Sequence, residues 1–391
     1  MAGKNLGGQQ PVAADYGSPR AAGSPHVPFG SNAVRLSVRQ WLVASGILLL
    51  MAWGVPLAWK QAEPLEPGPD YRVPYPLSHD YWMVRRWFDH AASGPSILVL
   101  GDSVVWGHYV QSRQTLSHYL SQLDGEHSFS NLGVDGIHPA ALAGLVEHYA
   151  KSVRGRRVLL HCNPLWMSSP RHDLAIDKEF AFNHPALVPQ FMPWIPCYRE
   201  TLSRRLGIVV RRHVPFFSWI DHLEIAYFDN TDLAAWTMEH PYANPLEAPT
   251  LRLPSPDTPP SPRPVARPWF EQGIERFNPP WVDLAVSFQW ERFRRTVEIL
   301  RRRDNRVFVL VGPFNQHMLV PESRRAYQAR WQQAVHWLQT HGIPHAAPPP
   351  LASHQYADAS HPLAEGYRSL AQGLLRDQAF RAFVNRAAPT E

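Results

Sequence analysis

The sequence predicts an α/β fold in which a mainly parallel sheet carries helices on both faces and follows one membrane-spanning helix. Short apolar runs alternate with amphipathic stretches along most of the chain, the pattern of repeated strand–helix–strand units. Apolar residues make up 45% of the 391 residues and charged residues 18%, a balance typical of a globular chain. One long apolar stretch without charges lies near the N-terminus, outside this alternation.

Residues 36–60 are predicted to form a transmembrane signal anchor. The stretch from Trp41 to Trp59 contains no charged side chain, and as a helix it would span roughly 28 Å, about one hydrocarbon thickness. Residues 1–35 are expected to be a disordered tail. The residues before the apolar stretch include four basic ones, Lys4, Arg20, Arg35 and Arg39, and only one acidic one, Asp15. The positive-inside rule therefore places this tail in the cytoplasm. Everything after Lys60 is then expected outside the cytoplasm, in the periplasm or at the cell surface.

The exported part is expected to contain a linker with a short helix at 61–94, followed by one domain at 95–386. The predicted strands are 96–100, 127–132, 157–162, 307–311 and 343–347. The predicted helices are 79–92, 113–123, 139–152, 283–303, 322–341 and 363–385. This alternation favours a three-layer α/β/α sandwich with a flavodoxin-like sheet.

A long insertion is predicted after the third strand, at about 165–282. It begins with many aromatic residues and continues with a proline-rich run at 241–268. Long insertions at strand ends often carry substrate recognition, and disorder is the alternative. The aromatic residues could stack on sugars or on a partner, or they could belong to the core.

The patterns of charged residues and of metal-binding residue types do not favour a nucleic acid or a metal ion as a partner. The formal net charge is +5, but no basic tract interleaved with aromatic residues follows a single element, so no nucleic-acid partner is expected. The histidine pair His341 and His345 is interrupted by glycine and proline, which does not favour a metal site. No metal or other cofactor is therefore expected. The two cysteines, Cys162 and Cys197, could pair outside the cytoplasm or remain buried thiols.

Ser103 is the first candidate catalytic residue. It belongs to Gly-Asp-Ser, placed directly after the first predicted strand and before a helix. A serine on such a turn presents its hydroxyl at the carboxyl edge of the sheet, where backbone N–H groups can face developing negative charge. A serine that only caps a helix is the alternative interpretation.

Asp358 and His361 form the second candidate pair, in Asp-Ala-Ser-His-Pro at the start of the last predicted helix. Because the two residues lie three apart at a helix start, the carboxylate can bind one imidazole nitrogen. The other nitrogen is then free to accept the proton of a serine hydroxyl. A capping aspartate beside a surface histidine would give the same short pattern.

Gly136 and Asn163 are candidate donors to a developing oxyanion. Gly136 ends the run Asn-Leu-Gly-Val-Asp-Gly after the second strand, and Asn163 follows the third strand. A glycine turn can aim a backbone N–H into a site, and an asparagine side chain supplies a further donor. Asn315, after the fourth strand, is the rival of Asn163, but in a 2-1-3-4-5 sheet the third strand lies next to the first.

In order and placement these four blocks resemble the SGNH/GDSL esterase-lipase superfamily. The resemblance covers residues 95–163 and 305–385 and implies that Ser103 is the nucleophile, His361 the general base and Asp358 the residue that orients it. It also implies an oxyanion hole formed by the amides of Ser103 and Gly136 and by the side chain of Asn163. The third block departs from the family pattern, because His-Cys-Asn-Pro stands in place of Gly-x-Asn-Asp.

The resemblance leaves three functions open. The first is an exported esterase that removes acyl groups, acetyl above all, from glycans or lipids. The second is an O-acetyltransferase that uses the same triad to modify a surface polysaccharide, with a membrane-bound acyltransferase as a possible partner. The third is a membrane-tethered binding module without catalytic activity. One fold can support all three functions, so the fold alone does not choose among them.

Overall fold

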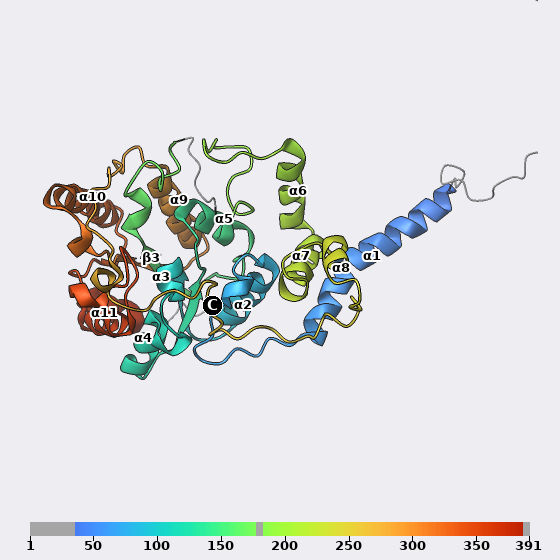
Figure 1. Cartoon of the computed structure of the whole chain (residues 1–391), viewed down its shortest axis with the longest axis horizontal. Helices are drawn as coiled ribbons and strands as arrows, with labels where there is room; N and C mark the ends of the chain where they lie inside the picture. Colours follow the sequence, from blue (N-terminus) through green and yellow to red (C-terminus); the bar gives the residue numbers. More distant parts are fainter. Residues whose placement is uncertain (1–35, 177–182, 386–391) are drawn as a thin grey trace, which may run out of the picture. The chain divides into compact units, whose positions relative to one another are not determined.

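The computed structural model describes residues 36–176 and 183–385, so the tail predicted at 1–35 lies outside the described residues. The chain divides into two units, residues 1–50 and residues 51–391. The boundary falls within helix α1 (Val38–Ala62), which is long and apolar enough to cross a membrane. All five described strands belong to the second unit (Figure 1).

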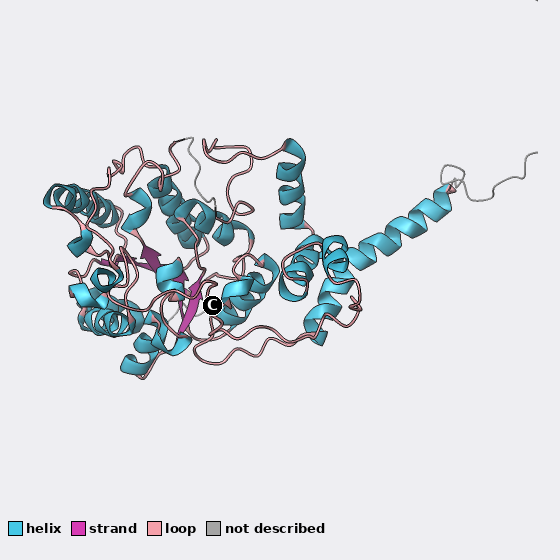
Figure 2. Ribbon diagram, in the orientation of Figure 1, coloured by secondary structure: helices cyan, strands magenta, loops and turns pink. Residues whose placement is uncertain are grey.

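Five parallel strands form one sheet in the order β2-β1-β3-β4-β5. Figure 2 shows strands in magenta among the helices. They are β1 (Ile97–Gly101), β2 (Phe129–Gly133), β3 (Arg157–Cys162), β4 (Arg306–Val311) and β5 (His345–Ala346). Every pair of neighbouring strands is parallel, so the predicted parallel sheet is confirmed. Because parallel strands share one direction, the segments after all five strands leave the sheet from the same edge.

The two faces of the sheet are buried in separate apolar clusters. Leu98 and Leu100 of β1 face one cluster, whereas Ile97 and Val99 face the other, as the two-residue period of a strand requires. Helices α2 (Tyr81–Ser93), α5 (Pro139–His148), α9 (Phe288–Arg302) and α10 (Pro321–Thr340) supply side chains to the first cluster. Helices α4 (Leu116–Asp124), α11 (Ala364–Arg376) and α12 (Gln378–Asn385) supply side chains to the second. Continuous burial of β1 on both faces explains why its sequence, Ile-Leu-Val-Leu, does not alternate.

The helices predicted outside the insertion are present with shifted ends, and four further described helices, one directly after β1 and three within residues 202–239, had no predicted bounds. After α1 the described helices are α2 (Tyr81–Ser93), α3 (Ser103–Trp106), α4 (Leu116–Asp124), α5 (Pro139–His148), α6 (Leu202–His213), α7 (Pro215–Tyr227), α8 (Leu233–Glu239), α9 (Phe288–Arg302), α10 (Pro321–Thr340), α11 (Ala364–Arg376) and α12 (Gln378–Asn385). α5 packs against α9, and α4 packs against α11 (Figure 1).

The last predicted helix is in fact two helices. Asp377 takes an extended conformation (φ −69°, ψ 126°) between α11 and α12. Its carboxylate accepts a hydrogen bond from the amide of Phe380 at 2.8 Å. An aspartate in this conformation caps a new helix rather than continuing the old one. The break lets Phe380 and Phe383 of α12 turn into the second apolar cluster.

Part of the stretch predicted as a linker is packed into the domain. Tyr71, Val73 and Leu77 are buried in the first apolar cluster, and Arg72 is 3% exposed. The proline content suggested an extended chain, but the aliphatic and aromatic residues between the prolines have apolar surface to bury. Residues 71–77 of the predicted linker therefore contribute buried side chains to the domain.

A buried group of charged residues fastens the end of α1 to the domain. Glu63 and His222 are fully buried, and a ring nitrogen of His222 lies 2.9 Å from the Glu63 carboxylate. The other nitrogen lies 2.6 Å from Asp80, and Arg86 and Tyr227 also donate to Glu63. Burial lowers the pKa of His222, but the two carboxylates outweigh burial and raise it to about 9.

We expect Glu63→Ala to destabilise the protein by about 3–5 kcal/mol, because it leaves Arg86 and His222 buried without their shared carboxylate. Thermal and denaturant unfolding of the full chain in detergent would measure the loss. Glu66→Ala, which changes an exposed acid three residues away, should unfold with the wild type. Equal stability of the two variants would contradict the structural role of Glu63.

Candidate active site

Ser103 lies at the first turn after β1, where glycine allows a close approach. α3 begins at Ser103 and packs against β2. A Cβ atom on Gly133, at the end of β2, would lie 2.3 Å from the backbone nitrogen of Trp106 in α3. Only glycine therefore fits at that position. The hydroxyl of Ser103 is thus held at the carboxyl edge of the sheet, the edge where ligands bind in open parallel sheets.

Ser103, His361 and Asp358 form a continuous hydrogen-bonded chain. Nε2 of His361 lies 2.8 Å from Oγ of Ser103, across 258 positions of sequence. On the opposite side of the ring, Nδ1 lies 2.8 Å from Oδ2 and 2.9 Å from Oδ1 of Asp358. With its Nδ1 proton bound by the carboxylate, the neutral imidazole presents Nε2 as an acceptor to the serine hydroxyl. The structure thus brings the three predicted residues together in the predicted order.

The loop of Asp358 is built to hold a charged carboxylate. Its oxygens accept hydrogen bonds from the amides of Ser360 and His361, both at 2.9 Å, and from the Tyr109 hydroxyl at 3.0 Å. Burial alone would raise the pKa of Asp358, but His361 and these donors hold it well below its ordinary value. Asp358 is therefore ionised throughout the physiological range.

Opposing effects set the pKa of His361. Burial lowers it, and the Asp358 carboxylate raises it by charge and by hydrogen bonding, with smaller contributions from Asp102 and Asp135. The net pKa lies above the ordinary value of histidine. A raised pKa makes His361 a stronger proton acceptor, provided that the pH is high enough for the ring to be neutral.

The two backbone donors predicted for an oxyanion hole lie at the ends of β1 and β2. Among the described residues, neither the Ser103 amide nor the Gly136 amide has a hydrogen-bond acceptor. Gly136 has a φ of +70°, a conformation that favours glycine. The neighbouring Asp135 binds His108 at 2.7 Å, and the His108 ring lies 5.4 Å from that of His361. The Gly136 turn therefore belongs to the surroundings of the triad.

Asn163 and Asn315, the two candidates for the third donor, have different partners. Asn163 donates from Nδ2 to Asp102 at 2.7 Å, which leaves the second hydrogen of this amide group. Asn315 donates from Nδ2 to the backbone oxygen of Asp358 at 3.0 Å, and its own amide donates to the Ala359 carbonyl. Asn315 thus fixes the loop of Asp358, and Asn163 stays the candidate donor.

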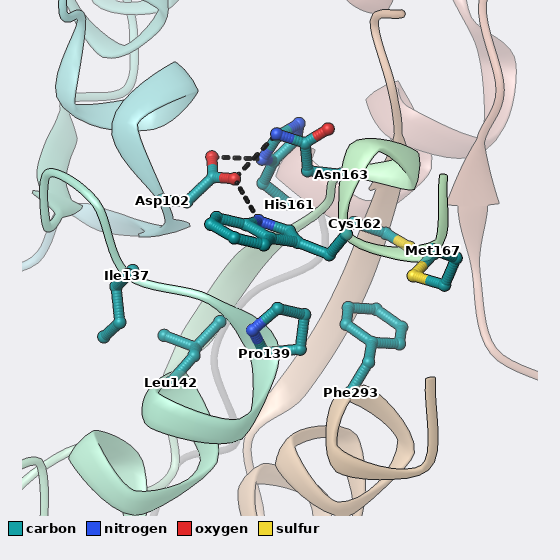
Figure 3. Close-up of a pocket in the computed structure, with 10 residues that line it drawn as sticks. Asp102, Ile137, Pro139, Leu142, His161, Cys162, Asn163, Met167 and Phe293 are labelled. Carbon is teal, nitrogen blue, oxygen red and sulfur yellow. Dashed lines mark hydrogen bonds and ion pairs between the residues drawn. The ribbon is translucent and has the colours of Figure 1, made fainter. Parts of the chain in front are cut away.

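The carboxylate of Asp102 joins the ends of β1 and β3 (Figure 3). It accepts hydrogen bonds from the Val104 amide at 3.0 Å and from Asn163, and it also binds His161 at 3.1 Å and the indole of Trp166 at 3.0 Å. Burial would raise the pKa of Asp102, but these partners, His161 first among them, lower it to about 2. The turn of Ser103 is therefore organised around a permanent negative charge.

A small cavity of about 10 Å³ adjoins this carboxylate. Beside the polar side chains of His161 and Asn163, its lining includes the apolar residues Ile137, Pro139, Leu142, Met167 and Phe293 (Figure 3). A space of this size holds about one water molecule. It is therefore too small for an acyl chain.

Three residues near the triad were not predicted: His108, Tyr109 and Asp135. The rings of His108 and Tyr109 lie 5.4 Å and 5.5 Å from the ring of His361. Asp135 stands inside the second sequence block, but no local spacing links it to His108, 27 positions earlier. The pair forms only because the turns after β1 and β2 are neighbours in the sheet.

The chain matches no protein-family model and no curated protein sequence. The case for a function therefore rests on the geometry of this site.

We expect the imidazole of His361 to titrate above the ordinary histidine value of about 6.5 in the wild type and below it in Asp358→Asn. The substitution removes the charge that raises the pKa and leaves burial, which lowers it. NMR of ¹³C-histidine-labelled protein would follow the titration, with His361→Gln identifying the resonance. An unchanged pKa in Asp358→Asn would contradict the role given to Asp358.

Proposed function

We propose that this chain is a membrane-anchored serine hydrolase of the SGNH/GDSL type that cleaves carboxylic esters, acetyl esters above all, on glycans or lipids. The observation that carries the proposal is the hydrogen-bonded chain from Ser103 through His361 to Asp358. The strand order with helices on both faces supports the three-layer sandwich expected of this superfamily, with residues 165–282 as its insertion.

The proposed reaction begins with proton transfer from Ser103 to His361. As Nε2 of His361 accepts the proton, Oγ of Ser103 attacks the ester carbonyl carbon. The negative charge on the carbonyl oxygen is stabilised by the Ser103 and Gly136 amides and by Asn163. His361 then gives the proton to the leaving alcohol oxygen, which leaves an acyl group on Ser103. Asp358 keeps the ring oriented and stabilises its transient positive charge.

Release of the acyl group repeats these steps with a second hydroxyl. Water loses a proton to His361 and attacks the acyl-enzyme, which gives a carboxylic acid and regenerates the Ser103 hydroxyl. A sugar hydroxyl in place of water would make the same site an O-acetyltransferase. The pair of His108 and Asp135 beside His361 supports the O-acetyltransferase as a second candidate function. This pair offers a further hydrogen-bond acceptor for the sugar hydroxyl.

The proposed location follows from α1. This helix is the only described one that is long and apolar enough to cross a membrane, and basic residues precede its apolar stretch. We infer an N-terminus in the cytoplasm and a catalytic domain on the outer side of the membrane. An acylated glycan or lipid would then be met beside the bilayer, and a membrane-bound acyltransferase is a candidate partner.

We expect Ser103→Ala to reduce ester hydrolysis by about 10⁴-fold or more, because no other group replaces the nucleophile. Release of p-nitrophenol from p-nitrophenyl acetate measures it. The exposed serine Ser203 provides the matched control, and Ser203→Ala should retain full activity. A fluorophosphonate probe should label the wild type and spare Ser103→Ala. Wild-type turnover by Ser103→Ala would rule out the proposed nucleophile.

We expect Asn163→Ala to lower kcat by roughly 10²–10³-fold, the effect of losing one oxyanion donor, and to leave the His361 titration in place. Asn315→Ala should act differently, because Asn315 holds the backbone of Asp358. Its effect on kcat should accompany a changed pKa of His361. Steady-state kinetics together with the NMR titration separate the two roles, and near-wild-type kcat in Asn163→Ala would exclude Asn163 from the oxyanion hole.

A further inference from the structure

A cleft of about 240 Å³ opens beside the triad. One side is formed by residues 106–114, which follow the nucleophile turn, and the other by residues 257–266 of the proline-rich run. His108 and Tyr109 line this cleft and also approach the ring of His361. Tyr109 in addition donates to Asp358. The cleft therefore shares two of its lining residues with the surroundings of His361.

The lining of the cleft is rich in hydrogen-bonding groups. Gln111 and Gln114 contribute amide side chains on one side, and Asp257 and Arg263 contribute charged groups on the other. Arg263 is exposed, so its guanidinium is accessible to a ligand. Amides, carboxylates and guanidinium groups bind hydroxyl and ring oxygens, whereas a hydrocarbon chain would leave them without partners.

His108 contributes an imidazole ring to the lining of this cleft. Its Nδ1 lies 2.7 Å from Asp135, and a carboxylate that accepts from Nδ1–H leaves Nε2 of the neutral ring as an acceptor. Within the described ranges, Nε2 of His108 has no hydrogen-bond partner. A hydroxyl entering along the cleft would meet this nitrogen beside His361.

The cleft is held in shape before any ligand arrives. Arg72, almost fully buried, donates to the carbonyls of Trp106 at 2.6 Å and Gly107 at 2.7 Å on one side. It also donates to the carbonyl of Pro256, next to the other side, at 3.1 Å. The amide of Ser112 donates to Asp257 across the cleft at 2.6 Å. A pre-formed site binds without the entropic cost of ordering a loop.

We propose that this cleft binds the alcohol part of the ester, a saccharide, and that His108 holds the saccharide hydroxyl next to His361. The proposal rests on the function proposed above and narrows its substrates from glycans or lipids to glycans. His108 acts here as a positioning residue, and Arg263 and the two glutamines as binding residues. The acyl group then lies on the opposite side of Ser103.

The test compares two acetyl esters that differ in their alcohol. The alcohol part of p-nitrophenyl acetate is p-nitrophenol, a good leaving group that needs no protonation. The alcohol part of acetylated oligosaccharides from xylan and glucomannan is a saccharide. We expect Arg263→Ala to raise KM for the oligosaccharides about 2–10-fold more than KM for p-nitrophenyl acetate, the effect of one lost hydrogen bond. His108→Ala should lower kcat for the oligosaccharides more than kcat for p-nitrophenyl acetate.

Arg252→Ala is the matched control, because Arg252 is exposed on the same segment and is not among the residues that line the cleft. This variant should leave the ratio of the KM values for the two esters unchanged. Equal effects of Arg263→Ala on both esters would overturn the saccharide site. So would wild-type cleavage of p-nitrophenyl acetate without cleavage of any oligosaccharide, or a KM change confined to p-nitrophenyl octanoate. Failure of the wild type to cleave p-nitrophenyl acetate would instead overturn the proposed hydrolase itself.

Discussion

The rest of the site depends on the hydrogen bonds that surround the buried carboxylate of Asp102. This carboxylate caps the short helix that begins at Ser103, and it binds His161 and Asn163 at the end of the neighbouring strand. Burying a carboxylate costs free energy unless several hydrogen-bond donors surround it. If one of these donors moved away, the charge of Asp102 would remain buried without a full set of partners. The nucleophile turn and the candidate oxyanion donor are thereby held in one arrangement.

The sequence predicted the parallel sheet well because β1, β3 and β4 are short, mainly apolar runs that are buried on both faces. Such runs are visible in the pattern of residues alone, as in Ile97–Gly101. The ends of helices were less predictable, since capping depends on single side chains such as Asp377. The packing of the stretch around Arg72 was not predicted, for another reason. Its prolines indicate extended chain, but they do not show whether that chain packs against anything.

The candidate site likewise contains residues that the sequence predicted and residues that it did not. Ser103, Asp358 and His361 belong to short sequence blocks with recognisable spacing, and the order of these blocks resembles that of a known superfamily. Their meeting could therefore be predicted from the blocks taken together. The pairing of His108 with Asp135, and the placement of Tyr109 against Asp358, has no local spacing to reveal it. These contacts arise from the shape of two turns. Likewise, the role of Asn315 in fixing the Asp358 loop appears only once the backbone positions are known.

The segment after α1 links the proposed anchor to the chemistry. Glu63, at the end of this helix, is locked to His222 and Arg86, and nine residues later Arg72 binds both sides of the cleft beside the triad. The chain therefore runs from the end of α1 to one wall of the cleft within nine residues, from Glu63 to Arg72. Because both residues are buried and hydrogen-bonded, packing rather than linker length sets the distance between the end of α1 and the turn of Ser103.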